Sequence, residues 1–471
     1  MATPTAPAAD ITDASPSAGG PSRLTEHHPQ QASDPDLPAA TIPGFPPRRR
    51  DGVEAARPGV IREGHITSVL HRLAAALHYR DFRVLWTGAF TSSIGTWMQK
   101  VAQNWLVLTI TGSASAFYLG LDTFLGEAPI LLFTLIGGVV ADRRDRRQLL
   151  LMSQYVQMTT AFTLAALVYW DVVSVWHVLT LSVVTGMAQA FGGPAYQSFI
   201  PLLVDKQHLP NAIALNSIQF NLARVIGPLI AGAALAAFGM AACFGLNGLS
   251  FLAVIAALLS LHVRHIPPAT GSRLRDELRS GFAYVRQEPA LVGLTFLAFA
   301  TTFLGNPLLT FLPLFAQNVF HGGVGQYTQL MACAGAGAVT GALVVAWLGR
   351  FRYMGRTVLT LQVVFGGLVV LFAITRVIWI NGVLLYVAGA CMVMVFAMIS
   401  SLVQLIAPNE LRGRVMSIYM VAFRGGMPLG SLMAGYAATQ TSPPLVLTVN
   451  GVLLGSVAAW FLIRGGGVKE L

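Results

Sequence analysis

Long apolar stretches alternate with short polar connections between residues 82 and 463. Each stretch has roughly the 20 residues that an α-helix needs to cross a bilayer. Only 11% of the residues are charged, whereas a soluble protein has about a quarter. The pattern therefore predicts an all-α membrane protein with twelve transmembrane helices. We place these helices at residues 82–110, 116–141, 149–170, 174–201, 212–238, 241–262, 290–317, 325–349, 356–375, 378–405, 412–438 and 443–463.

The chain outside these helices has a different composition. Residues 1–62 are rich in Pro, Ala, Ser and Asp, which predicts a disordered cytoplasmic tail. They lack a basic segment followed by an apolar core, so we expect no cleaved signal peptide. Residues 63–81 place Leu70 and Leu73 at helical spacing, which predicts an amphipathic helix on the cytoplasmic membrane surface. Residues 465–471 are expected to form a short tail.

Positive charge is concentrated in every second connection. Arginines crowd residues 143–147 and 264–286, whereas an alternate connection such as 111–113 has none, and Arg376 is the exception. This asymmetry is typical of loops that stay in the cytoplasm. We therefore predict a protein of the cytoplasmic (inner) membrane with both termini in the cytoplasm. The same asymmetry explains the net charge of +10, so we expect no nucleic-acid partner.

The longest internal connection, the predicted cytoplasmic linker 263–289, divides the helices into two groups of six. The N-terminal bundle covers residues 82–262 and the C-terminal bundle covers residues 290–464. An Arg-x-x-x-Pro pattern recurs at the same place in each group, in the fifth helix from Arg224 and in the eleventh from Arg424. Two parallel repeats with a site between them are typical of secondary transporters.

A cluster of charged residues interrupts the apolar sequence between the second and third helices. Its small-x-x-x-Asp-Arg-x-x-Arg-Arg pattern resembles the conserved loop of the major facilitator superfamily, except that Asp145 replaces the usual glycine. The matching residues are Gly138, Asp142, Arg143, Arg146 and Arg147.

Within that superfamily, the chain resembles most the enterobactin-exporter-like group, also described as transmembrane secretion effectors. The resemblance covers about residues 80–465, and it lies in residues 82–86, 95–99, 101–106, 214–217, 223–224 and 425–430. It implies that the second helix packs beside the eleventh, across the boundary between the halves. The chain departs from the group in residues 191–196, which lack the usual Asp and Arg, and at Lys100.

The charged loop is a candidate gate. A carboxylate is favoured near a helix N-terminus by the helix dipole and the free N–H groups. We therefore expect Asp142 to dock near the start of the eleventh helix when the cytoplasmic side closes. Arg412 or Arg414 would pair with it there.

Five charged side chains lie inside predicted helices, where each is costly unless paired or hydrated. They are Lys100, Asp122, Glu127, Arg224 and Arg424. A rise of about 1.5 Å per residue puts Lys100 and Glu127 roughly 15–16 Å from the outer face, and Asp122 roughly 9 Å. Glu127 is therefore expected to pair with Lys100, with Arg424 or with each in turn. Such a pair is either a permanent structural contact or a proton-sensitive switch. On depth, we predict Glu127 as the main coupling group and Asp122 as a hydrated, secondary one.

Arg224 has no acid in its own helix or in the eighth helix, its expected neighbour. It is either hydrated, hydrogen-bonded to backbone carbonyls freed by Pro228, or exposed to a cavity, where it would attract anionic groups. Other polar side chains could line that cavity or hold helices together. These candidates are Gln99, Gln103, Asn104, Gln189, Tyr196, Asn306, Gln317 and Gln404.

The function predicted from these features is proton-coupled export of a small amphiphilic or anionic molecule by alternating access. Uptake by the same fold and a non-transporting membrane receptor or scaffold are the alternatives. None of the three lysines stands in a Gly-Lys-Ser/Thr setting, so the chain has no P-loop. We find no clustered nucleophile, acid–base pair or metal ligands, and expect no enzyme activity, cofactor or metal. The expected partners are the lipid bilayer, the substrate and protons, and the expected state is a monomer.

Overall fold

The computed structural model describes residues 74–261, 282–408, 410–464 and 467–471. The side chains of Val139, Asp142 and Arg143 are also outside this description. The predicted tail 1–62 and most of the predicted linker 263–289 therefore fall outside the described residues. Of the predicted surface helix 63–81, the structure describes a short 3-10 helix, η1 (Ala74–His78), followed by the start of α2.

The described chain is almost entirely helical, and the helix ends lie within a few residues of the prediction. The first group contains α2 (Arg80–Thr111), η2 (Gly112–Ala114), α3 (Ser115–Arg143), α4 (Arg146–Tyr169), α5 (Val175–Phe199), η3 (Ile200–Leu202), η4 (Lys206–His208) and α6 (Leu209–Ser260). The second group contains α8 (Pro289–Gly305), α9 (Pro307–Thr310), α10 (Leu312–Leu314), η5 (Phe315–Val319), α11 (Val324–Leu348), α12 (Met354–Ile374), α13 (Ile378–Ile406), α14 (Arg412–Gln440) and α15 (Pro443–Arg464).

One predicted helix differs from the structure, whereas the boundary predicted between residues 238 and 241 is confirmed by a sharp turn. The predicted fifth and sixth helices are the two arms of α6, which turns sharply at Gly239 (φ 78°, ψ −178°), a backbone conformation that glycine adopts without strain. The predicted helix 290–317 is broken into α8, α9, α10 and the π-helical η5. Its breaks lie at Pro307 and Pro313, which lack the N–H that continues a helix.

Eight described segments are long and apolar enough to cross a membrane. Two of them, Arg80–Gly138 and Lys206–Ser260, each contain two of the predicted helices. The helices α4 and α14 are outside this set. The number of twelve crossings therefore stays a prediction, while the helical membrane class is confirmed.

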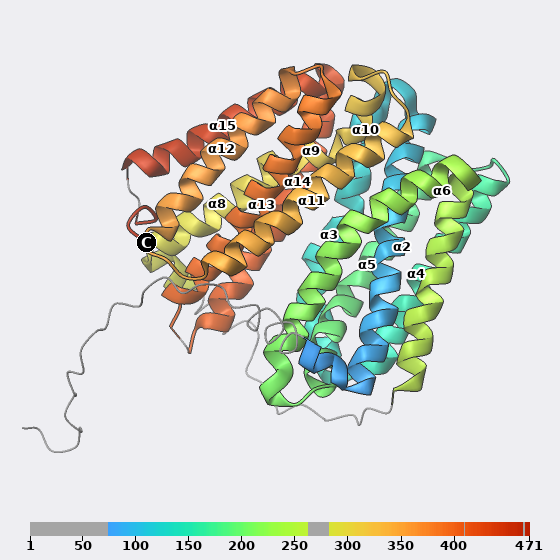
Figure 1. Ribbon diagram of the computed structural model, residues 1–471, viewed down its shortest axis with the longest axis horizontal. Coiled ribbons are helices and arrows are strands. Elements are labelled where there is room, and N and C mark those ends of the chain that lie inside the picture. The colour runs from blue at the N-terminus through green and yellow to red at the C-terminus, as the bar shows by residue number, and fades with distance from the viewer. Residues whose placement is uncertain (1–73, 262–281, 409, 465–466) are drawn as a thin grey trace, which may run out of the picture. The chain divides into compact units, whose positions relative to one another are not determined.

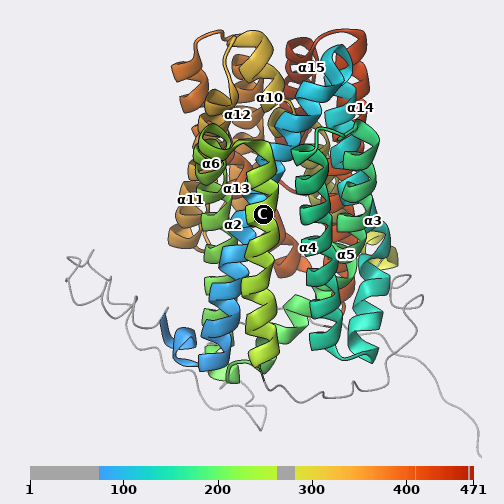
Figure 2. The same cartoon turned by 90° about the vertical axis from the view of Figure 1, so that its right-hand side faces the viewer.

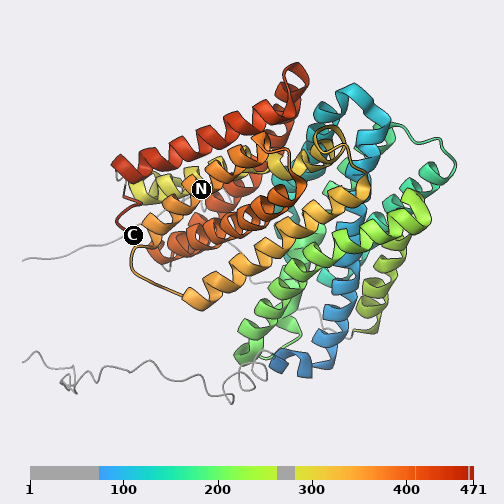
Figure 3. The same cartoon turned by 45° about the horizontal axis from the view of Figure 1, so that its top comes forward.

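Each group packs around its own helices. In the N-terminal group α2 lies along α6, α3 packs on α5, and α4 lies beside both α5 and the second arm of α6 (Figure 2). In the C-terminal group, drawn in yellow to red in Figure 3, α11 packs on α13 and α12 packs on α15. The helix α8 packs mainly on α14.

The basic connections lie at one end of the bundle, which we call the basic end. Arg147 Nε and Nη2 donate hydrogen bonds to the backbone oxygens of Leu258 and Leu259, which ties the start of α4 to the end of α6. In the second group, the backbone N–H of Gly355 donates to the oxygen of Leu471 at the same end. We call the opposite end, where η2 and η5 lie, the far end.

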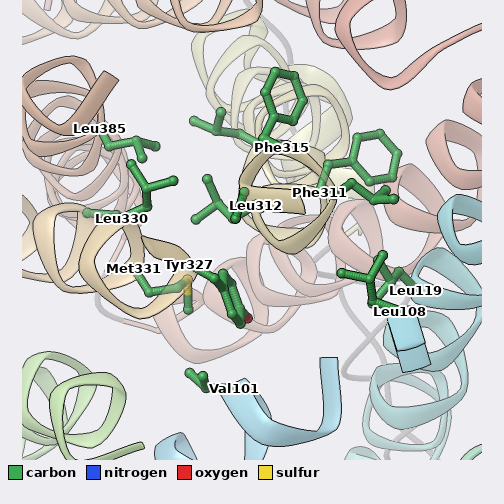
Figure 4. Packing of buried hydrophobic residues seen from close by; sticks show 14 of the residues in the cluster. Val101, Leu108, Leu119, Phe311, Leu312, Phe315, Tyr327, Leu330, Met331 and Leu385 are labelled. Carbon is green, nitrogen blue, oxygen red and sulfur yellow. The ribbon is translucent and has the colours of Figure 1, made fainter. Parts of the chain in front are cut away.

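The apolar core changes its organisation between these two ends. One cluster, the shared cluster, combines residues of both groups, including Val101, Leu108 and Leu119 with Phe311 and Leu312 (Figure 4). At the basic end, by contrast, one cluster is built from residues of the first group alone and another from residues of the second group alone. Figure 1 shows the same change of organisation. The two groups meet where α10 lies beside α2 and diverge toward the basic end.

Two helix pairs join the groups along their length, α3 with α14 and α6 with α11. The predicted packing of the second helix beside the eleventh is therefore confirmed. The α3–α14 contact is very close, since a Cβ added at Gly120 would lie 2.3 Å from the backbone oxygen of Ser431. One turn away, a Cβ added at Gly435 would lie 2.6 Å from the oxygen of Ala116. Small residues permit such backbone contact between membrane helices.

This contact generates a first prediction. Gly120→Leu inserts a side chain where the α14 backbone already lies, and overpacking of this kind costs about 1–3 kcal/mol. We expect a lower melting temperature for the purified protein, measured by loss of the monodisperse peak after heating. The control is Gly367→Leu, since a Cβ at Gly367 meets no atom within 4 Å. Equal melting temperatures for the two variants would contradict the close contact.

Candidate transport site

The first element of the site is an ion pair between neighbouring helices. Lys100 Nζ of α2 lies 3.9 Å from Glu127 Oε1 of α3. The two side chains are 42% and 24% exposed, so the pair is partly open rather than sealed in the core. This confirms the predicted contact between Lys100 and Glu127. A pair at the edge of the bonding distance, with access to its surroundings, can separate at low cost.

The second element is the ring of Trp97, which carries two cations. Lys100 Nζ lies 5.8 Å from the ring centroid and Arg224 Cζ lies 5.5 Å from it. Phe220 packs edge-on against the same ring at 5.9 Å. Gly227 allows α6 to approach, because an added Cβ would lie 2.4 Å from Trp97 Cβ. The site therefore combines aromatic surface with two positive charges.

From the sequence, Trp97 is no more than possible aromatic surface in the first helix, and its contact with two cations is not predicted. The missed signal is the helical spacing of three residues from Trp97 to Lys100 and of four from Phe220 to Arg224, which puts each pair on one helix face. Within the described chain, Arg224 forms no ion pair, and its guanidinium charge is met by the ring instead.

The third element is a polar cluster around Asp122, buried between α2, α3 and α5. Gln103 Nε2 donates to both carboxylate oxygens, at 3.0 and 2.9 Å, and Ser182 Oγ donates to Oδ1. Asp122 is only 6% exposed. The expectation that Asp122 is hydrated is therefore wrong. The side chain faces Gln103 of α2 and Ser182 of α5 rather than water.

Most of the predicted cavity residues join helices within one group. Asn247 Nδ2 donates to Gln99 (2.6 Å), Gln189 Nε2 donates to Gln157 (3.0 Å), and the Tyr196 hydroxyl donates to Asn216 (2.9 Å). Asn306 Nδ2 donates to Ser431 (3.1 Å). Gln404 is exposed and donates to Ser400 (3.3 Å), and Gln317 is exposed in η5. In this conformation the first four side chains act as contacts between helices, and their predicted contact with substrate stays a prediction.

Asn104 is different because its hydrogen bond joins the two groups. Its Nδ2 donates to the hydroxyl of Tyr327 in α11 at 3.1 Å, and both residues are buried. Trp105 stacks on the ring of Tyr327 with centroids 6.1 Å apart. Figure 4 shows Tyr327 beside Val101 at the edge of the shared cluster. Asn104 is thus part of the closure at the far end.

Arg424 is exposed on α14 and forms no ion pair with any described residue. The register of α3 and α14 nevertheless places it level with Glu127. Ala116 lies against Gly435 and Gly120 lies against Ser431. Continuing this antiparallel register by seven residues, about two turns, pairs Glu127 with Arg424.

The predicted gate is held by bonds within each group. Asp145 is the N-cap of α4, and its carboxylate accepts from the backbone N–H of Arg147 at 2.8 Å and of Gln148 at 3.3 Å. This role explains why an acid can replace the glycine of the motif. Arg146 Nη1 donates to the backbone oxygen of Ser198, and Arg412 Nε donates to that of Gln404.

Other parts of the gate are less defined. A Cβ added at Gly138 would meet no atom within 4 Å. The side chains of Asp142 and Arg143 are outside the described residues, so the docking of Asp142 beside Arg412 or Arg414 stays a prediction. In the described part of the chain, no group of three His, Cys, Asp or Glu side chains could hold a metal.

Solved structures with a similar fold are transporters. A POT family transporter superimposes with a TM-score of 0.65 at 11% identity, covering 83% of this chain and 97% of that one. A bacterial homologue of the human lysosomal transporter Spinster, in an inward-facing and unoccupied conformation, gives 0.59 at 15% identity and covers 82% and 98%. With the helix arrangement above, this similarity defines the chain as a multi-pass helical membrane protein with the major facilitator fold.

Sequence comparison identifies the family. The family described as transmembrane secretion effector matches residues 73–464, and the chain belongs to it. The staphyloferrin A transporter of Staphylococcus aureus is 25% identical, covering 79% of this chain and 92% of its own. The enterobactin exporter EntS of Salmonella typhimurium is 24% identical, covering 83% and 93%, and the macrolide efflux protein A of Streptococcus pyogenes is 23% identical, covering 58% and 67%. The chain is therefore a membrane transporter of a small-molecule substrate.

The contact between Asn104 and Tyr327 generates a second prediction. Tyr327→Phe leaves a buried amide donor unpaired, at a cost of about 1–3 kcal/mol to the closed far end. A single cysteine placed at buried Thr310, in a chain lacking the three native cysteines, should react with maleimide about fivefold or more faster. Tyr386→Phe is the control, because that hydroxyl bonds Thr340 inside the second group. An unchanged rate in Tyr327→Phe would show that this bond does not hold the far end closed.

Proposed function

We propose that this protein is a secondary active transporter that exports a small amphiphilic or anionic molecule from the cytoplasm, in exchange for protons. The basic end faces the cytoplasm, both termini lie there, and the chain acts as a monomer in the cytoplasmic membrane without a nucleic-acid partner. The positive-inside distribution of arginine supports this orientation. The names of the staphyloferrin A, enterobactin and macrolide relatives support export of siderophore-like or drug-like cargo.

The observation that carries the proposal is the partly open Lys100–Glu127 pair, located where the register of α3 and α14 brings Arg424 opposite Glu127. When the basic end is open, Glu127 stays with Lys100. When it closes, Arg424 of α14, which already packs on α3, competes for the same carboxylate. The equilibrium between the two states then depends on which cation Glu127 meets, which is what an alternating-access switch requires.

The organisation of the apolar core supports an inward-open assignment of this conformation. The shared cluster joins the groups at the far end only, and the clusters of the basic end are separate. Closing the basic end would bring the α3–α4 connection toward the start of α14. The proposed docking of Asp142 near Arg412 and Arg414, assisted by Gly138, Arg143, Arg146 and Arg147, belongs to that closed state.

Anionic cargo would be held at Trp97 by Arg224 and Lys100. The ring offers apolar contact, and the planar guanidinium can bind a carboxylate or a catecholate through two parallel hydrogen bonds. Gln99, Gln103, Asn104, Gln189, Tyr196, Asn306, Gln317 and Gln404 are the further candidates, and those now bonded between helices would have to exchange partners to reach a ligand.

The function is tested by flux measurements in proteoliposomes with a panel of siderophores and macrolides. A proton gradient of one pH unit should sustain about tenfold accumulation of a cargo exchanged one-for-one with protons. Collapse of the gradient by a protonophore should remove it. Accumulation that survives the protonophore would rule out proton coupling, and binding without any flux across the panel would favour a receptor.

A further prediction concerns the substrate specificity of the Arg224→Lys variant. It keeps the charge but loses the bidentate fork, so the affinity for carboxylate or catecholate cargo should fall by about tenfold. The affinity for cationic drugs should change little. Arg464→Lys is the control, because Arg464 stacks on Trp460 at the end of α15, away from this site. Equal losses for anionic and cationic cargo would indicate a structural role for Arg224.

A further inference from the structure

We infer that Asp122 is the carboxyl group that binds the coupling proton, held by Gln103 and Ser182 between α2, α3 and α5, and that Glu127 is the charge partner of Lys100. The inference rests on the proposed proton coupling and reverses the order expected from helix depth alone. Two acids of one helix then have separate tasks. Asp122 binds the proton, and Glu127 makes the charge contact.

The first argument is the contrast in surroundings. Asp122 is 6% exposed and, within the described chain, forms no ion pair, whereas Glu127 is 24% exposed and lies beside Lys100. A carboxylate buried inside a membrane protein without a cation is costly, and protonation removes that cost. A partly exposed carboxylate next to an ammonium group is stabilised as an ion. The buried site therefore favours a bound proton and the exposed one does not.

The second argument is that the partners of Asp122 accept either protonation state. A serine hydroxyl can donate or accept, and a glutamine side chain carries both a donor and an acceptor. In the ionised state, Ser182 and Gln103 both donate to the carboxylate, as in this structure. In the neutral state, Asp122 can donate its proton to Ser182 Oγ, whose own hydrogen then turns to another acceptor. The ionised state thus uses Ser182 as a donor, and the neutral state can use it as an acceptor.

The charged groups around Asp122 are few. Lys100 comes from α2, one turn from Gln103, and Glu127 comes from α3 itself. In α5, His177 lies in the first turn and is bonded to Ser174, and Tyr196 is bonded to Asn216. Beyond these helices, Arg224 of α6 lies on Trp97, and Arg424 lies on α14. Lys100 is thus the only one of these cations adjacent to the cluster, and Glu127 already pairs with it.

Proton binding at Asp122 can affect the conformational change through α3. Asp122 bonds α3 to α2 through Gln103 and to α5 through Ser182. A turn and a half further along α3, Glu127 pairs with Lys100. A change in the bonds at Asp122 changes how α3 is held within its own group. It thereby alters the position from which Glu127 meets Lys100 or Arg424.

The test compares Asp122→Asn with Glu127→Gln in full-length purified protein. The readout that needs no transport is the infrared band of a protonated carboxylic acid, followed as the pH is changed. We expect Asp122→Asn to lose one component of this band relative to the wild-type protein, and Glu127→Gln to retain that component. Loss of that component in Glu127→Gln with its retention in Asp122→Asn would overturn the inference.

Flux in proteoliposomes separates this inference from the proposed function. Asp122→Asn should lose gradient-driven accumulation but keep exchange of labelled for unlabelled substrate. Glu127→Gln should slow both activities, because it lacks the charge partner. If wild-type flux ignores the proton gradient, proton coupling fails, while the infrared result still decides whether Asp122 binds a proton. Accumulation driven by a sodium gradient and abolished in Asp122→Asn would make this a sodium site and overturn the inference.

A second pair of variants covers the case in which Asp122→Asn does not fold. Ser182→Ala removes one hydrogen bond to the carboxylate and should move the pH midpoint of the infrared band. Ser153→Ala is the control, since Ser153 is equally buried but donates to the backbone oxygen of Ala188 between α4 and α5. The same midpoint in Ser182→Ala and Ser153→Ala would contradict the assignment to Asp122.

Discussion

Burial of apolar side chains between the two helix groups at the far end is the interaction on which the rest of the structure depends. The shared cluster joins α2 and α3 to the broken helix α8–η5 and to α11, and the Asn104–Tyr327 bond lies at its edge. The core of each group at the basic end is complete without the other group. The two groups can therefore rotate about the far-end contact without exposing the interior of either one. Such rigid-body motion about a packed interface is a common way for proteins to switch state.

The charges inside the bundle follow from the same arrangement. A charged side chain at this depth is costly unless it is paired or hydrated, and the three cations differ in what they meet. Lys100 meets Glu127, and Arg224 meets the ring of Trp97. Arg424 has no described ion-pair partner in this conformation, although the helix register directs it to Glu127. We therefore propose two functions for α3. Asp122 is a proton site enclosed by its own group, and Glu127 is a charge contact across the boundary between the groups.

Much of this arrangement could be predicted from the sequence, and the parts that could not share a physical cause. Hydrophobic periodicity gives the helices and their depth, so the Lys100–Glu127 contact followed from equal depth on adjacent antiparallel helices. Depth does not give rotation about the helix axis, which decided that Asp122 faces Gln103 and Ser182 instead of water. For the same reason Gln99, Gln189 and Tyr196 could not be assigned to their helix partners in advance. Their partners Asn247, Gln157 and Asn216 are ordinary polar residues with no distinguishing pattern.

The central claim is that the far end and the basic end close in alternation, with Arg424 supporting the closed basic end. Spin-label distances test it most directly, with cysteines at exposed Gln148 and Glu410 for the basic end and at exposed Ser113 and Thr441 for the far end. Lowering the pH in the presence of substrate should shorten the first distance and lengthen the second in the same molecules. Arg424→Gln should reduce the population with the short basic-end distance. Two distances that change independently, or an Arg424→Gln variant with wild-type populations, would contradict the account.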